Sequence, residues 1–202
     1  MEMKKILLAT NNNHKVEEIQ AILKDLGYEV LARDQVYDGN FDVDENADTL
    51  AGNALLKAQA LRNLVSESYM VLADDTGLFV DALDGAPGVH SARYAGDAHD
   101  DEANKKKLLK ELEDVSEEKR TARFKTVMAL VQAGKDPVFI EGILEGKIAE
   151  EERGSSGFGY DPLFIPDGYS LSLGQMNPEE KNRISHRHNA LIKLAEYLKE
   201  LE

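Results

Sequence analysis

The chain has 202 residues and no cysteine, and its 38 Asp and Glu residues outnumber its 24 Lys and Arg residues, which gives a net charge of −14. The length suits one large domain or two closely joined lobes. The missing cysteines exclude disulfides, thiol catalysis and Cys-ligated zinc, and the negative field disfavours a nucleic-acid partner. No run approaches the roughly 18 apolar residues of a membrane span, and the start lacks a secretory signal. We therefore expect a cytoplasmic protein without a membrane partner.

The first part of the chain predicts a strand, a helix and a second strand. Residues 5–10 are typical of a buried strand. Apolar residues then recur at helical spacing over residues 16–26, with Glu17 and Glu18 expected in the first turn. Residues 28–32 predict the second strand.

The next part predicts a helix that leads into the central strand. The helix is expected from about residue 49 to residue 65, with Asp48 as its N-cap. The apolar stretch 69–73 predicts a buried strand that runs directly into Asp74 and Asp75 in a loop. Because the side-chain period of a strand is two, these carboxylates belong to opposite faces, and we expect them to have different roles. An ordinary Asp-rich turn is the alternative.

The second half of the chain predicts further elements of both kinds. Residues 85–96 are rich in Gly and Pro and predict an ordered loop, and an amphipathic helix follows. Residues 124–133 and 138–148 predict two adjacent strands, and residues 154–161 predict another Gly-rich loop. The chain closes on a helix capped by Ser185, whose apolar stripe is Leu191, Leu194, Ala195, Leu198 and Leu201. These elements predict a mixed α/β protein with a mixed sheet.

The segment Thr10-Asn11-Asn12-Asn13-His14-Lys15 lies where a strand, a polar turn and a helix N-terminus meet. Free backbone N–H groups and the positive end of a helix dipole favour an anion there. Lys15 adds a full positive charge, so the segment is a candidate anion cradle. A simple Asn cap is the alternative.

Three basic residues, Lys181, His186 and Arg187, cluster around the start of the closing helix. Cations in a first helical turn oppose the dipole unless an anion or an acceptor lies there. Such a conflict between a local rule and the sequence indicates function. A solvated basic face is the alternative.

The Gly-rich segment 155–162 surrounds Phe158 with glycines, which permit close backbone approach to a flat ligand. Either Phe158 or Tyr160 could stack on such a ligand, and Pro162 biases Asp161 towards an extended conformation. The alternative is an ordinary hairpin loop.

A hard cation could be held by Asp75 together with Asp44 or Glu45, since Mg²⁺ takes one or two carboxylates plus waters and substrate phosphates. A site for a magnesium–nucleoside triphosphate complex needs four parts, and the sequence offers a candidate for each. They are the anion cradle at residues 10–15, the carboxylates, the aromatic residues of segment 155–162 and the basic cluster.

Six motifs occur in the order found in one known family. They are residues 8–15 (LATNNNHK), 53–58 (NALLKA), 73–78 (ADDTGL), 87–94 (PGVHSARY), 157–162 (GFGYDP), and Lys181 with residues 185–187 (SHR). On these motifs the chain resembles the inosine/xanthosine triphosphate pyrophosphatases, the Ham1 or non-standard purine nucleoside triphosphatase family, from about residue 6 to residue 194.

The resemblance implies hydrolysis of ITP, dITP and XTP to the monophosphate and pyrophosphate with Mg²⁺, which cleanses the nucleotide pool. It also implies one domain over residues 1–202, with a long twisted mixed sheet, helices on both faces of that sheet, and two lobes that enclose a central cleft. A homodimer is implied as well.

The resemblance further implies a role for individual residues. Asp75 is expected to be the general base and a metal contact, with Glu45, or Asp44 in its place, as the second metal carboxylate. The residues expected to hold the triphosphate are Thr10, Asn11, Asn12, Asn13, His14, Lys15 and Thr76. Those expected to hold the base and the rest of the nucleotide are Phe158, Gly159, Tyr160, Asp161, Lys181, His186 and Arg187.

Selectivity is expected at the purine 6-position, where inosine and xanthosine present an oxo acceptor and adenine presents an amino donor. Arg187, His186 or a loop backbone N–H would meet the oxo group.

One departure from the family concerns Gly52, which stands where Glu is frequent, so the entry to the second helix near Glu45 is expected to differ. Two rival functions are a nucleotide sensor without turnover and a pyrophosphatase for modified pyrimidine or methylated nucleotides, as in the similarly folded Maf group.

Overall fold

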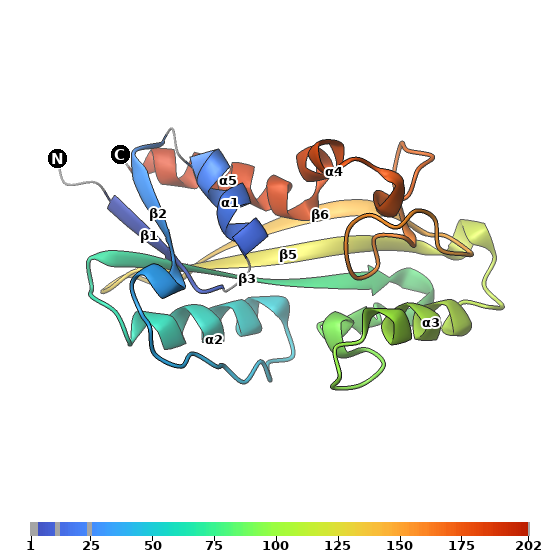
Figure 1. Ribbon diagram of the computed structural model, residues 1–202, viewed down its shortest axis with the longest axis horizontal. Coiled ribbons are helices and arrows are strands. Elements are labelled where there is room, and N and C mark those ends of the chain that lie inside the picture. The colour runs from blue at the N-terminus through green and yellow to red at the C-terminus, as the bar shows by residue number, and fades with distance from the viewer. Residues whose placement is uncertain (1–3, 11–12, 24–25, 202) are drawn as a thin grey trace. The chain divides into compact units, whose positions relative to one another are not determined.

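The computed structural model describes residues 4–10, 13–23 and 26–201, without the side chains of residues 13 and 14. The strands are β1 Lys4–Leu8, β2 Tyr28–Ala32, β3 Tyr69–Val80, β4 Pro87–Gly88, β5 Thr121–Val131, β6 Val138–Ile148 and β7 Phe164–Pro166 (Figure 1). The helices are α1 Asn13–Leu23, α2 Leu50–Arg62, α3 Asp101–Glu111, α4 Pro178–Ile184 and α5 His186–Glu200. None of the helices in these described ranges is long and apolar enough to cross a membrane.

The strands form one mixed sheet in the order β2-β1-β3-β5-β6-β7, with β4 paired to β3. β1 runs parallel to both β2 and β3, whereas β4 is antiparallel to β3 and β7 is antiparallel to β6. The predicted mixed α/β class is therefore confirmed.

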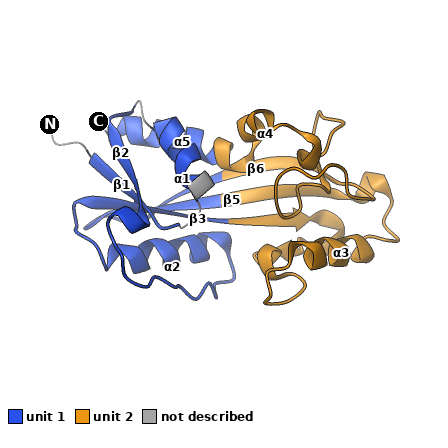
Figure 2. Ribbon diagram, viewed as in Figure 1, with its two compact units in different colours: residues 1–75, 127–141, 190–202 blue, residues 76–126, 142–189 orange. Residues whose placement is uncertain are grey.

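The chain divides into two compact units. Unit 1 comprises residues 1–75, 127–141 and 190–202, and unit 2 comprises residues 76–126 and 142–189 (Figure 2). The predicted central cleft stays a prediction.

In unit 1, alternation along the strands produces two apolar faces, and each face is covered by helices. Even-numbered residues of β1 and β3 such as Ile6 and Leu72 pack with α1 and α5 in one buried cluster. Odd-numbered residues such as Leu7 and Val71 pack with α2 in another. Helices therefore lie on both faces of this part of the sheet, as predicted (Figure 1).

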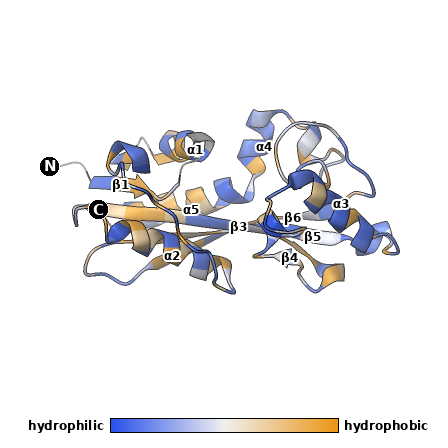
Figure 3. Cartoon of the chain, turned by 60° about the horizontal axis from the view of Figure 1, so that its bottom comes forward, coloured by the Kyte–Doolittle hydropathy of each residue, from blue (hydrophilic) through white to orange (hydrophobic). Residues whose placement is uncertain are grey.

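Unit 2 has its own buried core. Leu108 and Leu112 of the α3 segment pack there with Phe124 of β5, Ile148 of β6 and Phe164 of β7. α3 is otherwise largely hydrophilic (Figure 3), so its attachment to the core depends on few apolar side chains.

The central strand is longer than the sequence predicts. β3 continues through Asp74 and Asp75 to Val80, so the two carboxylates lie within a strand and the predicted loop is wrong. The strand continues because Leu78 pairs with Gly88 of β4, an element inside the segment predicted as a loop. A Cβ at Gly77 would lie 2.4 Å from the Gly88 carbonyl oxygen, so glycine is what permits this close pairing.

Several helix boundaries also differ from the predictions. α1 begins at Asn13, so Glu17 and Glu18 lie beyond its first turn. The basic cluster is divided between two helices, because α4 carries Lys181 and ends before Ser185. Ser185 does cap α5 as predicted, since its Oγ accepts a hydrogen bond from the His188 backbone N–H. Leu201, predicted as part of the α5 stripe, lies beyond the helix and is exposed.

The N-cap of α2 is Thr49 and not the predicted Asp48, because Thr49 Oγ1 accepts the Gly52 N–H at 3.0 Å. Thr49→Ala should therefore lower the free energy of unfolding by about 1 kcal/mol, measured by urea denaturation, whereas Thr49→Ser should preserve it. The matched control is Asp48→Ala at an exposed neighbouring position, with an expected loss below about 0.5 kcal/mol. An equal loss in both alanine variants would contradict this assignment.

Candidate functional site

Two adjacent carboxylates in the middle of β3 face different helices, as strand periodicity predicts. On the α1 side, Lys15 Nζ lies 2.7 Å from Asp74 Oδ2, and the Asp74 side chain is only 7% exposed. On the α2 side, Asn53 Nδ2 donates to Asp75 Oδ2 at 3.1 Å. The two carboxylates therefore have separate partners.

Lys57 of α2 connects Asp75 to the acidic segment at residues 42–48. Its Nζ atom lies 2.7 Å from Glu45 Oε2 and 3.6 Å from Asp75 Oδ1. One ammonium group thus faces two carboxylates. Asp44, which precedes Glu45 in the sequence, is exposed. Burial lowers the pKa of Lys57, but the charges of Asp75, Glu45 and Asp74 outweigh that effect, so the pKa is raised from its ordinary value.

Asn53 fixes the acidic segment against α2. The Asn53 side chain is almost fully buried, and its Oδ1 accepts the Ala47 backbone N–H at 2.9 Å while its Nδ2 donates to Asp75. Gly52 permits the close approach, since a Cβ at that position would lie 2.6 Å from Ala47 Cβ. The departure from the family at Gly52 therefore coincides with the packing of the segment that carries Glu45.

A polar pocket of about 280 Å³ opens within unit 1 beside these groups. Two lysines and three acidic residues contribute to its wall, which consists of Ala9, Thr10, Lys15, Phe41, Asp42, Val43, Glu45, Lys57 and Asp74. A larger hollow of about 680 Å³ in unit 2 lies between Asp81 and Thr121 and contains none of the predicted site residues. The smaller pocket is the better candidate, because the charged groups converge there.

The predicted anion cradle is only partly described. Asn13 and His14 begin α1, so a helix N-terminus follows β1 as predicted, and Lys15 lies in the first turn. Asn11 and Asn12 lie outside the described residues.

In unit 2, the segment of residues 157–161, here called the Phe158 loop, is organised around Asp161. Asp161 Oδ2 accepts the Phe158 backbone N–H at 2.8 Å and lies 2.5 Å from Lys181 Nζ. The same Nζ atom is 4.6 Å from the centroid of the Phe158 ring, a cation–π contact. Phe158 itself is 65% exposed, which leaves its ring available to a ligand.

The ring of Tyr160, unlike that of Phe158, is not accessible to a ligand. Its ring is buried in the core of unit 2, and its hydroxyl donates to the Ser91 carbonyl oxygen at 2.8 Å. Burial is also the first reason why its pKa is raised. The buried ring of Tyr160 is therefore not available to stack on a ligand in this structure, and a stacking role for the exposed Phe158 stays a prediction.

The remaining predicted residues of unit 2 lie on β3 and α5. Thr76 Oγ1 donates to Thr126 Oγ1 of β5 at 2.9 Å. The His186 ring stacks on Phe124 with centroids 5.0 Å apart and an interplanar angle of 18°. Arg187 follows in the first turn of α5.

The sequence interpretation missed Asn53 and Lys57 as parts of the site. They lie four residues apart within motif 53–58, and this spacing puts both side chains on one face of α2. Two polar residues among the alanines of a buried helix face were the available signal. Their partners were not predictable, because Glu45 and Asp75 are distant in sequence.

Comparison with known proteins identifies the family. A family model described as the Ham1 family matches residues 6–197. The chain belongs to the Ham1 family. The resemblance read from the six motifs is thereby confirmed.

Individual Ham1 relatives match over almost their whole length. A dITP/XTP pyrophosphatase of Thermoanaerobacter sp. (strain X514) is 50% identical over 200 residues, which cover 98% of each chain. A dITP/XTP pyrophosphatase of Bacillus subtilis (strain 168) is 44% identical over 196 residues, 97% of this chain and 98% of the relative. The structure of the Staphylococcus aureus Ham1 protein superposes with a TM-score of 0.89 at 37% identity and covers 98% of this chain and 100% of that one.

Replacing the shared cation should destabilise unit 1. Lys57→Met should lower the free energy of unfolding by about 1–2 kcal/mol near neutral pH, because it removes the positive charge that Lys57 supplies to Glu45 and Asp75. Because the pKa of Lys57 is raised in the folded state, this contribution is fully present below the unfolded-state pKa of about 10.4 and is lost as the pH rises through the folded value.

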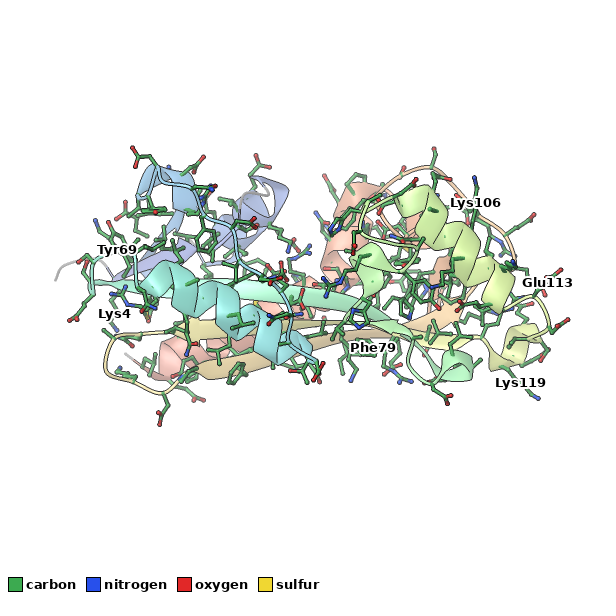
Figure 4. All side chains as sticks on the ribbon, turned by 90° about the horizontal axis from the view of Figure 1, so that it is seen from below. Lys4, Tyr69, Phe79, Lys106, Glu113 and Lys119 are labelled. Carbon is green, nitrogen blue, oxygen red and sulfur yellow. The ribbon has the colours of Figure 1, made fainter. Side chains whose placement is uncertain are left out.

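Urea denaturation of both proteins at neutral and at strongly alkaline pH measures this difference. Lys106→Met is the matched control, since Lys106 points away from α3 into solvent (Figure 4). Equal stability of wild type and Lys57→Met near neutral pH would contradict the prediction.

Proposed function

We propose that this protein hydrolyses non-standard purine nucleoside triphosphates, among them dITP, ITP and XTP, to the monophosphate and pyrophosphate. The Thermoanaerobacter and Bacillus relatives, named dITP/XTP pyrophosphatases, support this class of enzyme. The observation that carries the proposal is the placement of Glu45 and Asp75 around the ammonium group of Lys57. Lys57 and Glu45 line one pocket together with Lys15. Such an arrangement suits a cation and a polyphosphate together.

The residues fit the Mg²⁺ that we propose as cofactor. Glu45 and Asp75 each direct an oxygen towards the Lys57 ammonium group, so both carboxylates can face one cation. Carboxylate oxygens are also the ligands that Mg²⁺ prefers. Glu45 is favoured over Asp44, because Asp44 is exposed while Glu45 shares Lys57 with Asp75. Within the described residues, no three His, Asp or Glu side chains form a metal-binding group, so waters and phosphate oxygens would complete the coordination. When bound, Mg²⁺ would neutralise phosphate charge and polarise the phosphoryl oxygens.

Asp75 is the proposed general base. Asn53 holds Asp75 Oδ2, which fixes the orientation of the carboxylate. Asp75 then orients or deprotonates the water that attacks the α-phosphorus, while the bond from the α-phosphorus to the bridging oxygen breaks and pyrophosphate leaves. Lys15 and the N-terminus of α1 contribute positive charge that stabilises the departing pyrophosphate.

Base recognition is assigned to unit 2. The exposed ring of Phe158 is the proposed stacking platform, with Lys181 beside it. The backbone N–H groups of Phe158 and Gly159 already donate to Asp161 and Asp101. These N–H groups are therefore poor candidates for the purine 6-oxo group, which favours the side chains of His186 and Arg187.

The remaining expectations stay predictions. They are the homodimer implied by the resemblance, and the cytoplasmic location and lack of nucleic-acid and membrane partners expected from composition and charge.

Asp75→Asn should reduce kcat for ITP by about 100-fold or more, the usual size of a general-base contribution. The measurement is pyrophosphate release with and without Mg²⁺. Asp84→Asn is a matched control, because Asp84 is exposed and has a φ of 52°, a conformation that Asn also adopts. A near-normal kcat for Asp75→Asn would remove Asp75 from the mechanism.

The same assay on a substrate panel tests the proposed function itself. ITP, dITP and XTP should exceed ATP, GTP and UTP in kcat/KM. Binding of ITP without pyrophosphate release would indicate a sensor, and preference for a pyrimidine would favour the rival pyrophosphatase class.

Arg187→Ala should narrow the preference for ITP over ATP by about 10-fold in kcat/KM, because a donor to the 6-oxo group is lost. Arg183→Ala is the control, since Arg183 is exposed on α4. An unchanged ITP-to-ATP ratio in Arg187→Ala would refute this role.

A further inference from the structure

The Phe158 loop is attached at two points by carboxylates. The internal attachment is Asp161, which accepts the Phe158 N–H. The external attachment is Asp101, the first residue of α3, whose Oδ2 accepts the Gly159 N–H at 3.0 Å from 58 positions away in the sequence. The second contact ties the loop to a helix that carries none of the predicted site residues.

The N-terminus of α3 is firmly held, so it can serve as an anchor. Asp100 caps the helix by accepting the Ala103 N–H at 3.0 Å. Asn104 is 2% exposed, accepts the Ala95 N–H at 2.6 Å and donates to the Ala92 carbonyl oxygen at 3.1 Å. The contacts of Asn104 fasten the first turn of α3 to motif 87–94, through Ala92, and to Ala95, the residue that follows it.

The helix does not need Asp101 for its own start. Asp100 already provides the cap, and Glu102 supplies a second negative charge for the helix dipole in the same turn. What Asp101 adds is a charge-assisted hydrogen bond to a backbone N–H of the Phe158 loop. An exposed aromatic ring on a Gly-rich loop has many conformations to lose, so an anchor of this kind reduces the entropy cost of presenting the ring.

We propose that Asp101 is a positioning residue for nucleotide binding: by accepting the Gly159 N–H, it holds the Phe158 loop in the conformation that presents the ring to the purine base. This inference rests on the proposed function. Asp101 acts through Gly159 and the loop, without contact to the substrate.

The first test measures the hydrogen bond between the Gly159 N–H and Asp101 directly, in the absence of nucleotide. Hydrogen exchange of the Gly159 amide, followed by NMR, should become about 5-fold to 10-fold faster in Asp101→Ala, since a hydrogen bond to a charged acceptor is lost. Asp101→Asn keeps an acceptor oxygen and should restore most of the protection. Glu102→Ala is the matched control, because it removes a carboxylate from the same turn that contacts Lys105 and not the loop. Unchanged exchange in Asp101→Ala overturns the proposal.

The second test measures the consequence for substrate. KM for ITP should rise about 10-fold in Asp101→Ala while kcat stays within about 3-fold of wild type, because the loop must be ordered on binding. Asp101→Asn should recover most of the wild-type KM, and Glu102→Ala should keep it. Thermal unfolding checks that each variant is folded. If Asp101→Ala is not folded, Asp101→Leu carries the test, because its side chain also lacks an acceptor and is close to Asp in size.

The outcomes separate this inference from the function on which it rests. A wild-type KM in an active, folded Asp101→Ala protein overturns the positioning role and leaves the proposed function intact. Failure of the wild-type protein to release pyrophosphate from any purine triphosphate overturns the proposed function, and the role of Asp101 with it.

Discussion

The central constraint on unit 1 is the neutralisation of two carboxylates in the middle of β3. Asp74 and Asp75 leave the strand on opposite faces, and each meets a lysine from a different helix, Lys15 on α1 and Lys57 on α2. Removing a carboxylate from water costs several kcal/mol unless a partner compensates it. In a chain with a net charge of −14, basic partners are outnumbered by carboxylates. The positions of α1 and α2 against β3 are therefore fixed by charge pairing as well as by apolar packing.

The proposed phosphate chemistry would use both signs of charge in unit 1. Carboxylates alone would repel a triphosphate, and lysines alone would offer no base and no ligand for a hard cation. Asn53 provides the geometry that connects the two, because one buried amide holds both the acidic segment at Ala47 and the Asp75 carboxylate. A buried amide with both its donor and its acceptor in use specifies a single arrangement of the groups around it.

In unit 2 the main feature is an apolar ring, that of Phe158, which is exposed to water. The Phe158 ring is 65% exposed, and Asp161 and Asp101 accept hydrogen bonds from two backbone N–H groups of the Phe158 loop. Tyr160 shows how the loop is attached to the core, since its ring is buried and its hydroxyl reaches Ser91. Two aromatic residues of one motif, separated by Gly159, therefore have opposite environments: Tyr160 is buried and Phe158 is exposed.

The sequence by itself determined the α/β class, most helices and strands, the opposite directions of Asp74 and Asp75, and membership of the Ham1 family. These features depend on local periodicity and on short motifs, both of which are properties of neighbouring residues. Only the tertiary structure decided that β3 continues past Asp75, that Thr49 caps α2, that Glu45 shares Lys57 with Asp75, and that Asp101 reaches Gly159. Each of these depends on which distant backbone or charge comes within hydrogen-bonding distance. Periodicity along the chain carries no information on such approaches, because they are set by how the helices and strands pack.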